Sequence, residues 1–362
     1  MRFVAALVGI VLVAGVLRDA FETIILPRRV SGLRISKIFY RLSWKPWAAV
    51  ARRVPPSERR ESFLSVYGPL TLLLLLVLWG LFLISGFALL LWSANYGSQS
   101  AFETLYVSGV NFTTLGLGDF VPHTDLARFV TVVEAGVGFG FLAVVISYLP
   151  ILYQSFSRRE SAISVLDEWA GSPPSAGELF RRVVKAGAIE ELRPLLDRWE
   201  VWTAELLESH LSYQVLCYFR SQHENQSWLA ALTAIMDLAS AWLAAQVEGR
   251  TWAARRLYAI GRHALGDLSQ VLQSPPRFDA PDRLTEAELE AIHGDLLAVG
   301  VTIDLASFRE RLNILRRGYE PYAHALSHRL VMDLPPWMHA EGQKDNWETT
   351  AWEGSAPGES LH

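Results

Sequence analysis

The sequence predicts an all-α membrane protein that carries a helical domain outside the bilayer, and three observations support this. Only 19% of the residues are charged and 51% are apolar, whereas soluble globular chains carry about 25% charged residues. Residues 62–102 contain no charged side chain, and a second apolar run over 129–156 is interrupted by one charge, Glu134. The second half of the chain instead places apolar residues at helical spacing.

The first element is an N-terminal transmembrane helix over residues 1–26. Residues 3–17 are apolar, Arg18 and Asp19 interrupt the run, and apolar residues then resume. A cleaved signal peptide is the alternative. Against it, the leading residues carry only one basic side chain and no small-x-small cleavage site follows the run. We therefore expect a retained helix.

Residues 27–64 are predicted to be a basic linker at the cytoplasmic face. Residues 27–61 hold ten Lys and Arg side chains, opposed only by Glu58 and Glu61. The positive-inside rule then places the N-terminus outside and the C-terminus in the cytoplasm. Apolar side chains near helical spacing favour a helix on the inner leaflet, with a solvated linker as the alternative; they are Ile35, Ile38, Phe39, Leu42 and Trp47.

Residues 65–156 are predicted to form two membrane-spanning helices separated by a shorter one. The runs over 69–92 and 129–156 are long enough to span, since about 20 apolar residues cross a bilayer. Residues 101–113 also read as a helix. At about 1.5 Å per residue this helix is about 20 Å long, which is too short to span but long enough to enter the membrane halfway.

The segment after the short helix, TLGLGD at residues 114–119, predicts a cation path lined by backbone oxygens. Glycine tolerates positive φ, so the alternating Gly116 and Gly118 allow successive carbonyls to point to one side, and Thr114 adds a hydroxyl oxygen. Rings of such oxygens replace the hydration shell of a monovalent cation. The C-terminal end of the short helix favours a cation beyond it. A glycine-rich extracellular turn that binds no ion is the alternative.

TLGLGD resembles the potassium-channel selectivity filter, whose common form is T-V-G-Y-G-D. The resemblance covers about residues 65–156, because outer helix, pore helix, filter, D-x-x-P and inner helix follow in the family's order. It implies K⁺ as the permeant ion, with no cofactor. The residues that it assigns are Thr114, Leu115, Gly116 and Leu117 as K⁺ ligands, Gly118 as the end of the filter, Thr113, Asp119 and Tyr106 as filter supports, and Gly138 as the gating hinge.

Two residues depart from the common filter. Leu115 replaces Val and Leu117 replaces Tyr. Neither change removes a backbone carbonyl, but the second removes a hydroxyl that anchors the filter from behind. Two-pore-domain potassium channels use similar strings in their second pore loop. A single pore loop per chain implies a homotetramer.

Two further residues of the inner helix are candidate regulatory positions. A carboxylate inside a membrane helix, here Glu134, is a functional hypothesis by default. It would hydrogen-bond behind the filter or gate the pore by titration, and a packing role is the alternative. Pro150 is expected to kink the helix near the cytoplasmic mouth, either as part of the gate or as the end of the helix.

Residues 157–334 predict a helical cytoplasmic domain, which follows a loop at 171–174. Its helical stretches lie near 177–188, 189–211, 227–246, 251–273, 285–299 and 305–331. The tail over 335–362 lacks apolar periodicity and is predicted to be disordered and acidic. The chain has no catalytic motif, so we do not expect an enzyme. A net charge of −4 gives no case for a nucleic-acid partner.

These observations predict a homotetrameric potassium channel of the cell membrane, surrounded by lipid and gated by its helical domain or by an unidentified cytoplasmic regulator. A weakly selective monovalent cation channel is one alternative. The other is a membrane anchor or sensor whose pore does not conduct and whose helical domain is the interaction module.

Overall fold

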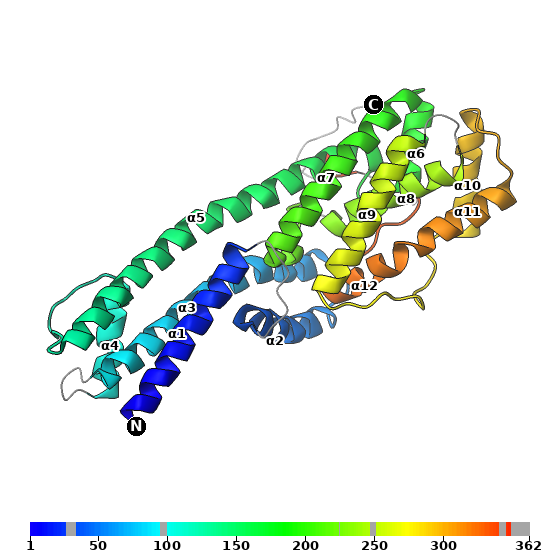
Figure 1. Ribbon diagram of the computed structural model, residues 1–362. Coiled ribbons are helices and arrows are strands. Elements are labelled where there is room, and N and C mark those ends of the chain that lie inside the picture. Colours follow the sequence, from blue (N-terminus) through cyan, green and yellow to red (C-terminus); the bar gives the residue numbers. More distant parts are fainter. Residues whose placement is uncertain (27–33, 95–99, 224, 247–250, 340–344, 349–362) are drawn as a thin grey trace, which may run out of the picture. The chain divides into compact units, whose positions relative to one another are not determined.

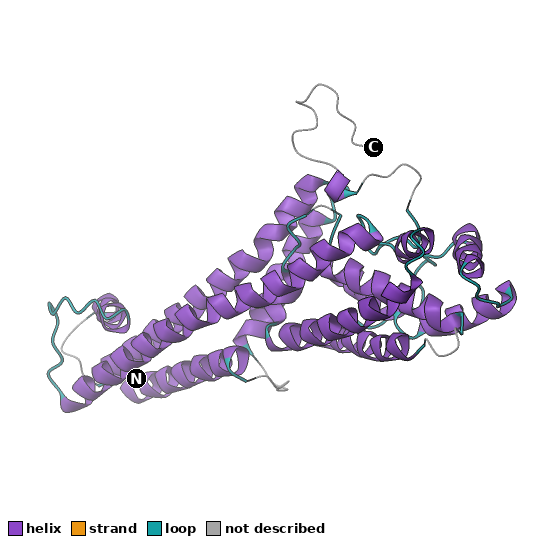
Figure 2. Cartoon of the chain, turned by 90° about the horizontal axis from the view of Figure 1, so that it is seen from above, coloured by secondary structure: helices purple, strands orange, loops and turns teal. Residues whose placement is uncertain are grey.

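The computed structural model describes residues 1–26, 34–94, 100–223, 225–246, 251–339 and 345–348 (Figure 1). All regular secondary structure in this part of the chain is helical (Figure 2). The described residues divide into two compact units: unit 1 comprises Met1–Ala49 and Val66–Gln154, and unit 2 comprises Val50–Ser65 and the residues from Ser155 onward. The predicted all-α class is confirmed.

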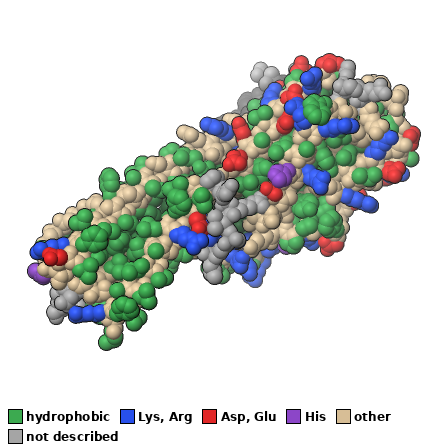
Figure 3. Space-filling model, viewed as in Figure 1, with side chains coloured by type: hydrophobic (Ala, Val, Ile, Leu, Met, Phe, Trp, Pro, Cys, Tyr) green, Lys and Arg blue, Asp and Glu red, His purple; other side chains and the backbone are tan. Residues whose placement is uncertain are grey.

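Three helices are long and apolar enough to span a membrane among the described residues: α1 (Arg2–Ile24), α3 (Glu58–Ser93) and α5 (Asp125–Ala170). These are the helices that the sequence predicts, although α3 begins before residue 69 and α5 extends beyond residue 156. The visible surface of unit 1 is mostly hydrophobic, whereas unit 2 shows mixed charges (Figure 3). This contrast is expected if unit 1 lies in lipid and unit 2 in water.

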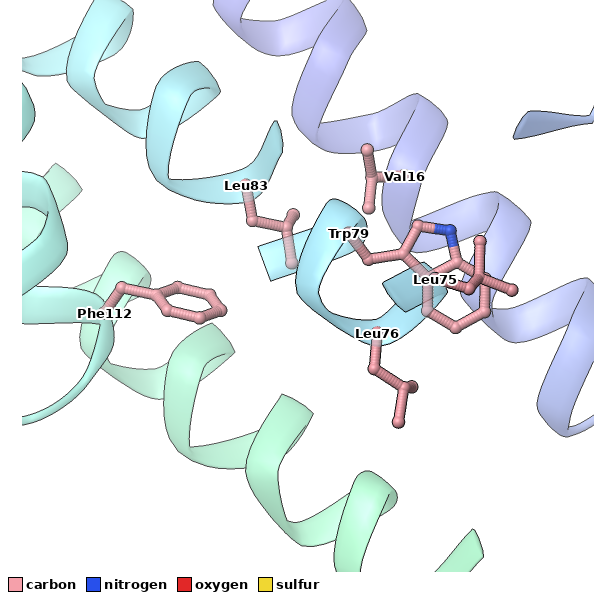
Figure 4. Packing of buried hydrophobic residues seen from close by; sticks show 6 residues of the cluster. All are labelled: Val16, Leu75, Leu76, Trp79, Leu83 and Phe112. Atoms are coloured by element: carbon pink, nitrogen blue, oxygen red, sulfur yellow. The ribbon is translucent and has the colours of Figure 1, made fainter. Parts of the chain in front are cut away.

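Helix α1 packs closely against α3 within unit 1. A methyl group added to Gly9 would lie 2.8 Å from the Gly86 carbonyl oxygen, and one added to Gly86 would lie 2.7 Å from Val13. Small residues allow such close approach of membrane helices. Figure 4 shows the adjoining core, in which Val16 of α1 and Trp79 of α3 are buried. The retention of α1 stays a prediction.

The buried carboxylate of Asp19, on α1, joins α1 to two other helices. It accepts hydrogen bonds from the Trp79 indole nitrogen at 2.9 Å and from the backbone nitrogen of Ser36 at 2.9 Å. Ser36 lies in the first turn of α2 (Ile35–Ala51), and Arg34 approaches the same carboxylate at 3.6 Å. Each charge is therefore compensated, as burial requires.

Helix α2 confirms the predicted helix within the basic linker, but the linker is not one unit. Residues 35–49 belong to unit 1, where the Trp44 and Tyr67 rings meet edge to face at 4.7 Å. Residues 50–65 belong to unit 2. The boundary after residue 65 lies one residue from the predicted one, but the division after residue 49 falls inside the predicted linker, because the end of α2 and the first turns of α3 pack with the helical domain.

The predicted loop at 171–174 follows α5 directly. Pro150 lies inside α5, and the helix continues past it to Ala170. The interpretation of Pro150 as the helix end is therefore wrong, since a proline removes one backbone donor and a long helix retains the bonds on either side.

Unit 2 is built around α8 (Trp228–Ala244), which is buried along almost its whole length. The surrounding helices are α6 (Ala176–Lys185), α7 (Leu192–Ser212), α9 (Trp252–Val271), α10 (Glu286–Ala298), α11 (Leu305–Arg317) and α12 (Glu320–Leu330), with short 3₁₀ turns η1 (Ile189–Glu191), η2 (Gln214–Tyr218) and η3 (Asn346–Glu348). The predicted stretches at 177–188, 189–211, 227–246, 251–273 and 285–299 each overlap one of these helices, although α6 begins at Ala176 and α7 ends at Ser212.

The predicted single helix over 305–331 is wrong, because the chain breaks between α11 and α12. A methyl group on Gly318 would lie 2.4 Å from the Tyr258 hydroxyl, and the neighbouring Tyr319 is fully buried with its hydroxyl bonded to Asp237. The second helix then restarts with Pro321 in its first turn, a position that proline favours.

The predicted disorder of residues 335–362 is wrong for the part that the structure describes. Trp337 is fully buried, and its carbonyl accepts hydrogen bonds from Ser175 Oγ at 2.8 Å and from the Gly177 nitrogen at 2.9 Å. The physical reason is that a pocket formed by distant helices receives this one aromatic side chain. Residues 340–344 and 349–362 lie outside the described residues.

Candidate ion-conduction site

The predicted pore helix is α4 (Ala101–Phe112), and both of its ends are capped. At the start, the Ser100 side chain accepts from the Glu103 nitrogen at 3.3 Å, and the Glu103 carboxylate accepts from the Ser100 nitrogen at 2.7 Å, which is a capping box. At the end, the Thr114 nitrogen donates to Asn111 at 3.0 Å and the Leu115 nitrogen donates to Val110 at 2.9 Å. This pair of bonds is a Schellman motif, and it fixes where the helix stops and the TLGLGD segment begins.

Positive φ angles alternate along the segment that follows. Thr114 has φ +57°, Gly116 +59° and Gly118 +75°. The two glycines adopt the conformation that the sequence predicts for them, whereas a β-branched residue such as Thr114 rarely does so. The intervening Leu115 and Leu117 side chains are 62% and 58% exposed within the single chain. The backbone therefore alternates with a period of two, and the leucines have little packing from their own subunit.

Side chains on both sides of this segment hold it to α4. Thr113 Oγ1 donates to the Gly109 carbonyl at 2.7 Å. The Tyr106 hydroxyl donates to Asp119 Oδ2 at 2.9 Å, and its ring meets Phe120 edge to face at 6.2 Å. The structure thus brings together Tyr106 and Asp119, two residues that the resemblance assigns as filter supports. Their bond connects the middle of α4 to the residue directly after Gly118.

Replacing Tyr106 with phenylalanine is expected to reduce the preference for K⁺ over Na⁺ by about threefold, as for the loss of one hydrogen bond, without abolishing current. The ring contact with Phe120 remains, but the anchor on Asp119 is lost. The measurement is the permeability ratio from reversal potentials. Tyr153→Phe is the matched control, because Tyr153 is exposed and lies far along α5. An unchanged permeability ratio in Tyr106→Phe would contradict the prediction that Tyr106 supports the filter through Asp119.

Glu134 is buried behind the candidate filter and connects three helices. Its carboxylate bonds to the hydroxyl of Ser108 on α4, and Asn111 is a second polar neighbour on the same helix. Ser108 Oγ also lies 2.7 Å from the carbonyl oxygen of Ile84 on α3. Of the roles considered for Glu134, hydrogen bonding behind the filter has these contacts in its favour. The regulatory role stays a prediction.

Gly138 touches the end of α4. A methyl group placed on it would lie 1.9 Å from the Phe112 carbonyl oxygen. Phe112 is the last residue of α4 and is buried, with its ring 5.9 Å from that of Phe141 on α5. Gly138 therefore permits the close approach of α5 to the pore helix. Its role as a gating hinge stays a prediction.

Sequence reasoning missed Ser108 and Asp19. Each is a polar residue within a helix of unit 1, and a buried polar residue in a membrane helix indicates a partner on another helix. A polar side chain in a membrane helix indicates a functional or structural partner for Glu134, and it does so equally for Ser108 and Asp19. The identity of the partners follows only from the packing, because Trp79 lies 60 residues after Asp19.

An apolar helix, a short capped helix, a loop with alternating positive φ and a second apolar helix together define the pore domain of an ion channel. In agreement with this, residues 71–155 match the family model described as "Ion channel". The chain therefore has three candidate membrane-spanning helices, and residues 71–155, which are less than half of its length, are similar to this family.

One curated relative is similar over part of its length. The uncharacterized membrane protein YdjJ of Bacillus subtilis is 26% identical over 187 residues, which are 48% of this chain and 52% of that protein. The match thus covers about half of each chain. No solved structure matches the chain.

Proposed function

We propose that the chain forms a homotetrameric, potassium-selective channel of the cell membrane, with its N-terminus outside and unit 2 in the cytoplasm. K⁺ passes through rings of oxygens from Thr114, Leu115, Gly116 and Leu117. The observation that carries the proposal is the alternation of positive φ at Thr114, Gly116 and Gly118, directly after a capped pore helix. A backbone that alternates in this way allows successive carbonyls to point to one side, which a binding site for a dehydrated monovalent cation requires.

The fourfold assembly follows from the incompleteness of one chain. A single pore loop provides one side of a cation site, and four are needed to surround the ion. Large apolar side chains of α5 are exposed within the subunit, including Phe129, Val132, Phe139, Leu142 and Ile146. A tetramer would cover part of this surface against other copies and leave the rest to lipid.

A weakly selective cation channel is the second candidate, and Leu117 favours it. The Leu117 side chain is exposed within the subunit and has no hydroxyl, so it cannot hold the candidate filter in place by a hydrogen bond. The Tyr106–Asp119 bond supports the filter only at its outer end. The two candidates differ in selectivity, since both conduct through the same backbone.

The reversal potential of purified protein in planar bilayers separates the candidates. We expect it to follow the K⁺ equilibrium potential, about 59 mV for each tenfold K⁺ gradient, and to shift little when Na⁺ is added to the low-K⁺ side. A reversal near zero under the same gradient with Na⁺ would favour the weakly selective channel. Absence of K⁺ flux from liposomes, in a tetramer of confirmed stoichiometry, would contradict conduction and favour the anchor interpretation.

A further inference from the structure

A segment toward the C-terminal end of unit 2, which we call the strap, contacts the first turn of α3 and the residues that follow the end of α5. The strap comprises the described residues 331–339 and 345–348. It begins where Val331, at φ +56°, ends α12. Arg220 fixes this point, because its guanidinium donates to the Leu330 and Val331 carbonyls at 2.7 and 2.8 Å. From here the chain runs over residues that are distant in the sequence.

The strap first contacts the cytoplasmic start of α3. Arg60, which is 7% exposed, donates to Asp333 Oδ2 at 2.7 Å. Glu61 lies 3.4 Å from Arg60 and 3.3 Å from Arg220, so the four side chains alternate in charge. Since Arg60 is nearly buried, it depends on these carboxylates for compensation. Helix α3 then continues without a break from this cluster into its membrane-spanning part.

The strap next contacts the loop that directly follows α5. Ser175 and Gly177 donate to the Trp337 carbonyl, and the Ser172 nitrogen donates to Asp345 Oδ1 at 3.1 Å. A methyl group on Gly177 would lie 2.6 Å from the Trp337 carbonyl oxygen, so the fit is close. The loop begins at the residue after Ala170, where α5 ends. The strap is therefore bonded to the loop directly after α5 and to the start of α6.

Trp337, between these two contacts, is fully buried. The guanidinium groups of Arg283 and Arg316 lie 6.0 and 5.5 Å from its ring, within the range of cation–π attraction. Arg283 is itself bonded to the buried Asp237 at 2.8 Å and to Glu320 at 2.7 Å. This network connects the strap to α8 and α12, the helices of the domain core.

We propose that the strap is a tie between the cytoplasmic ends of the outer and inner pore helices, and that it limits the movement of α5 relative to α3. A displacement of α5 pulls on the Trp337 contacts and reaches α3 through Asp333 and Arg60. The tie itself follows from contacts within unit 2, and only its effect on opening rests on the proposed channel function. Locking the tie lowers conduction, and loosening it raises conduction.

The tie is tested without conduction by hydrogen exchange of the full-length protein in lipid nanodiscs. In Trp337→Ala we expect amide exchange to rise by about tenfold both in residues 62–66 and in residues 171–177, since a buried tryptophan stabilises its surroundings by several kcal/mol. Trp252→Ala is the matched control, because Trp252 is 68% exposed on α9, and it should change neither region. A rise confined to residues 171–177 would overturn the tie.

Its effect on opening is tested by a reversible crosslink in liposome flux assays. Arg60→Cys combined with Asp333→Cys is joined by a cleavable bifunctional thiol reagent. We expect K⁺ flux to fall by about fivefold, the lower range of allosteric coupling, and to recover on reduction. Both single-cysteine variants are controls. The native Cys217 does not interfere, because it is buried and burial raises the pKa of its thiol to about 12.

The outcomes separate the two proposals. Equal flux before and after crosslinking, in a protein that conducts, would overturn the gating role of the strap and leave the channel function intact. Absence of flux in the wild type would contradict the channel function, and the exchange measurement alone would then decide whether the tie exists.

Discussion

Alanine in place of Gly116 is expected to abolish K⁺ current while the protein still assembles. The glycine has φ +59°, and an L-residue in this region costs about 1–2 kcal/mol. A tetramer carries the change four times around one axis. Relief of this strain rotates the peptide planes on either side, so the carbonyls no longer point toward the ion. Single-channel recording, with size-exclusion chromatography for assembly, measures both effects.

The fold should survive this change, because a methyl group on Gly116 meets no atom within 4 Å in the subunit. Gly109→Ala is the matched control, since Gly109 lies within α4 and its added methyl group also meets nothing within 4 Å. Alanine favours a helix, so this variant should conduct normally. Normal current in Gly116→Ala would contradict the proposal that residues 114–118 line the conduction path.

Gly138→Ala is expected to destabilise the pore domain and to reduce ion selectivity. The added methyl group would lie 1.9 Å from the Phe112 carbonyl oxygen, a backbone atom that cannot move by rotamer change. Overpacking of this kind costs about 1–3 kcal/mol. Helix α5 and the end of α4 must therefore separate, and Thr114 begins the candidate filter two residues after Phe112. Thermal unfolding in detergent and reversal potentials are the measurements.

Two neighbouring glycines provide the controls for this prediction. Gly136 and Gly140 lie on the same helix, and a methyl group on either meets nothing within 4 Å in the subunit. Gly136→Ala and Gly140→Ala should leave thermal stability and selectivity unchanged. If Gly138 served only as a hinge, Gly138→Ala would lower the frequency of opening but change neither quantity. That result would contradict the packing role.

The membrane helices and the short helix between them could be predicted because their signals are local. An uncharged, mostly apolar run such as 62–102 is unfavourable in water and favours a membrane helix. The spacing of Gly116 and Gly118 likewise indicates a backbone with positive φ angles. The burial of Trp337 could not be predicted in the same way. Its flanking sequence has no apolar periodicity, and the residues around it come from separate helices that are distant in the sequence, among them Phe180 and Leu238. Burial of this kind depends on the finished fold.

The same reason explains why the division within the basic linker could not be predicted. Basic residues across 27–64 look alike in the sequence, but Arg34 compensates Asp19 within unit 1, whereas Arg60 compensates Asp333 within unit 2. Charge alone does not distinguish these partners. By contrast, the break between α11 and α12 has a local signal, which is Pro321 in the first turn of α12. A prediction that used this proline would have divided the stretch over 305–331 into two helices.

The carboxylate of Asp19 has a consequence for how the protein is made. Asp19 is buried near the C-terminal end of α1, and a buried carboxylate is costly until it is paired or hydrogen-bonded. Its partners, Ser36 and Trp79, are synthesised 17 and 60 residues later. Stable insertion of α1 therefore depends on the arrival of α3 in the bilayer. Helix α1 is synthesised first, but the last hydrogen bond to Asp19 forms only when α3 is present. The order of synthesis of the membrane helices therefore differs from the order in which their polar groups become paired.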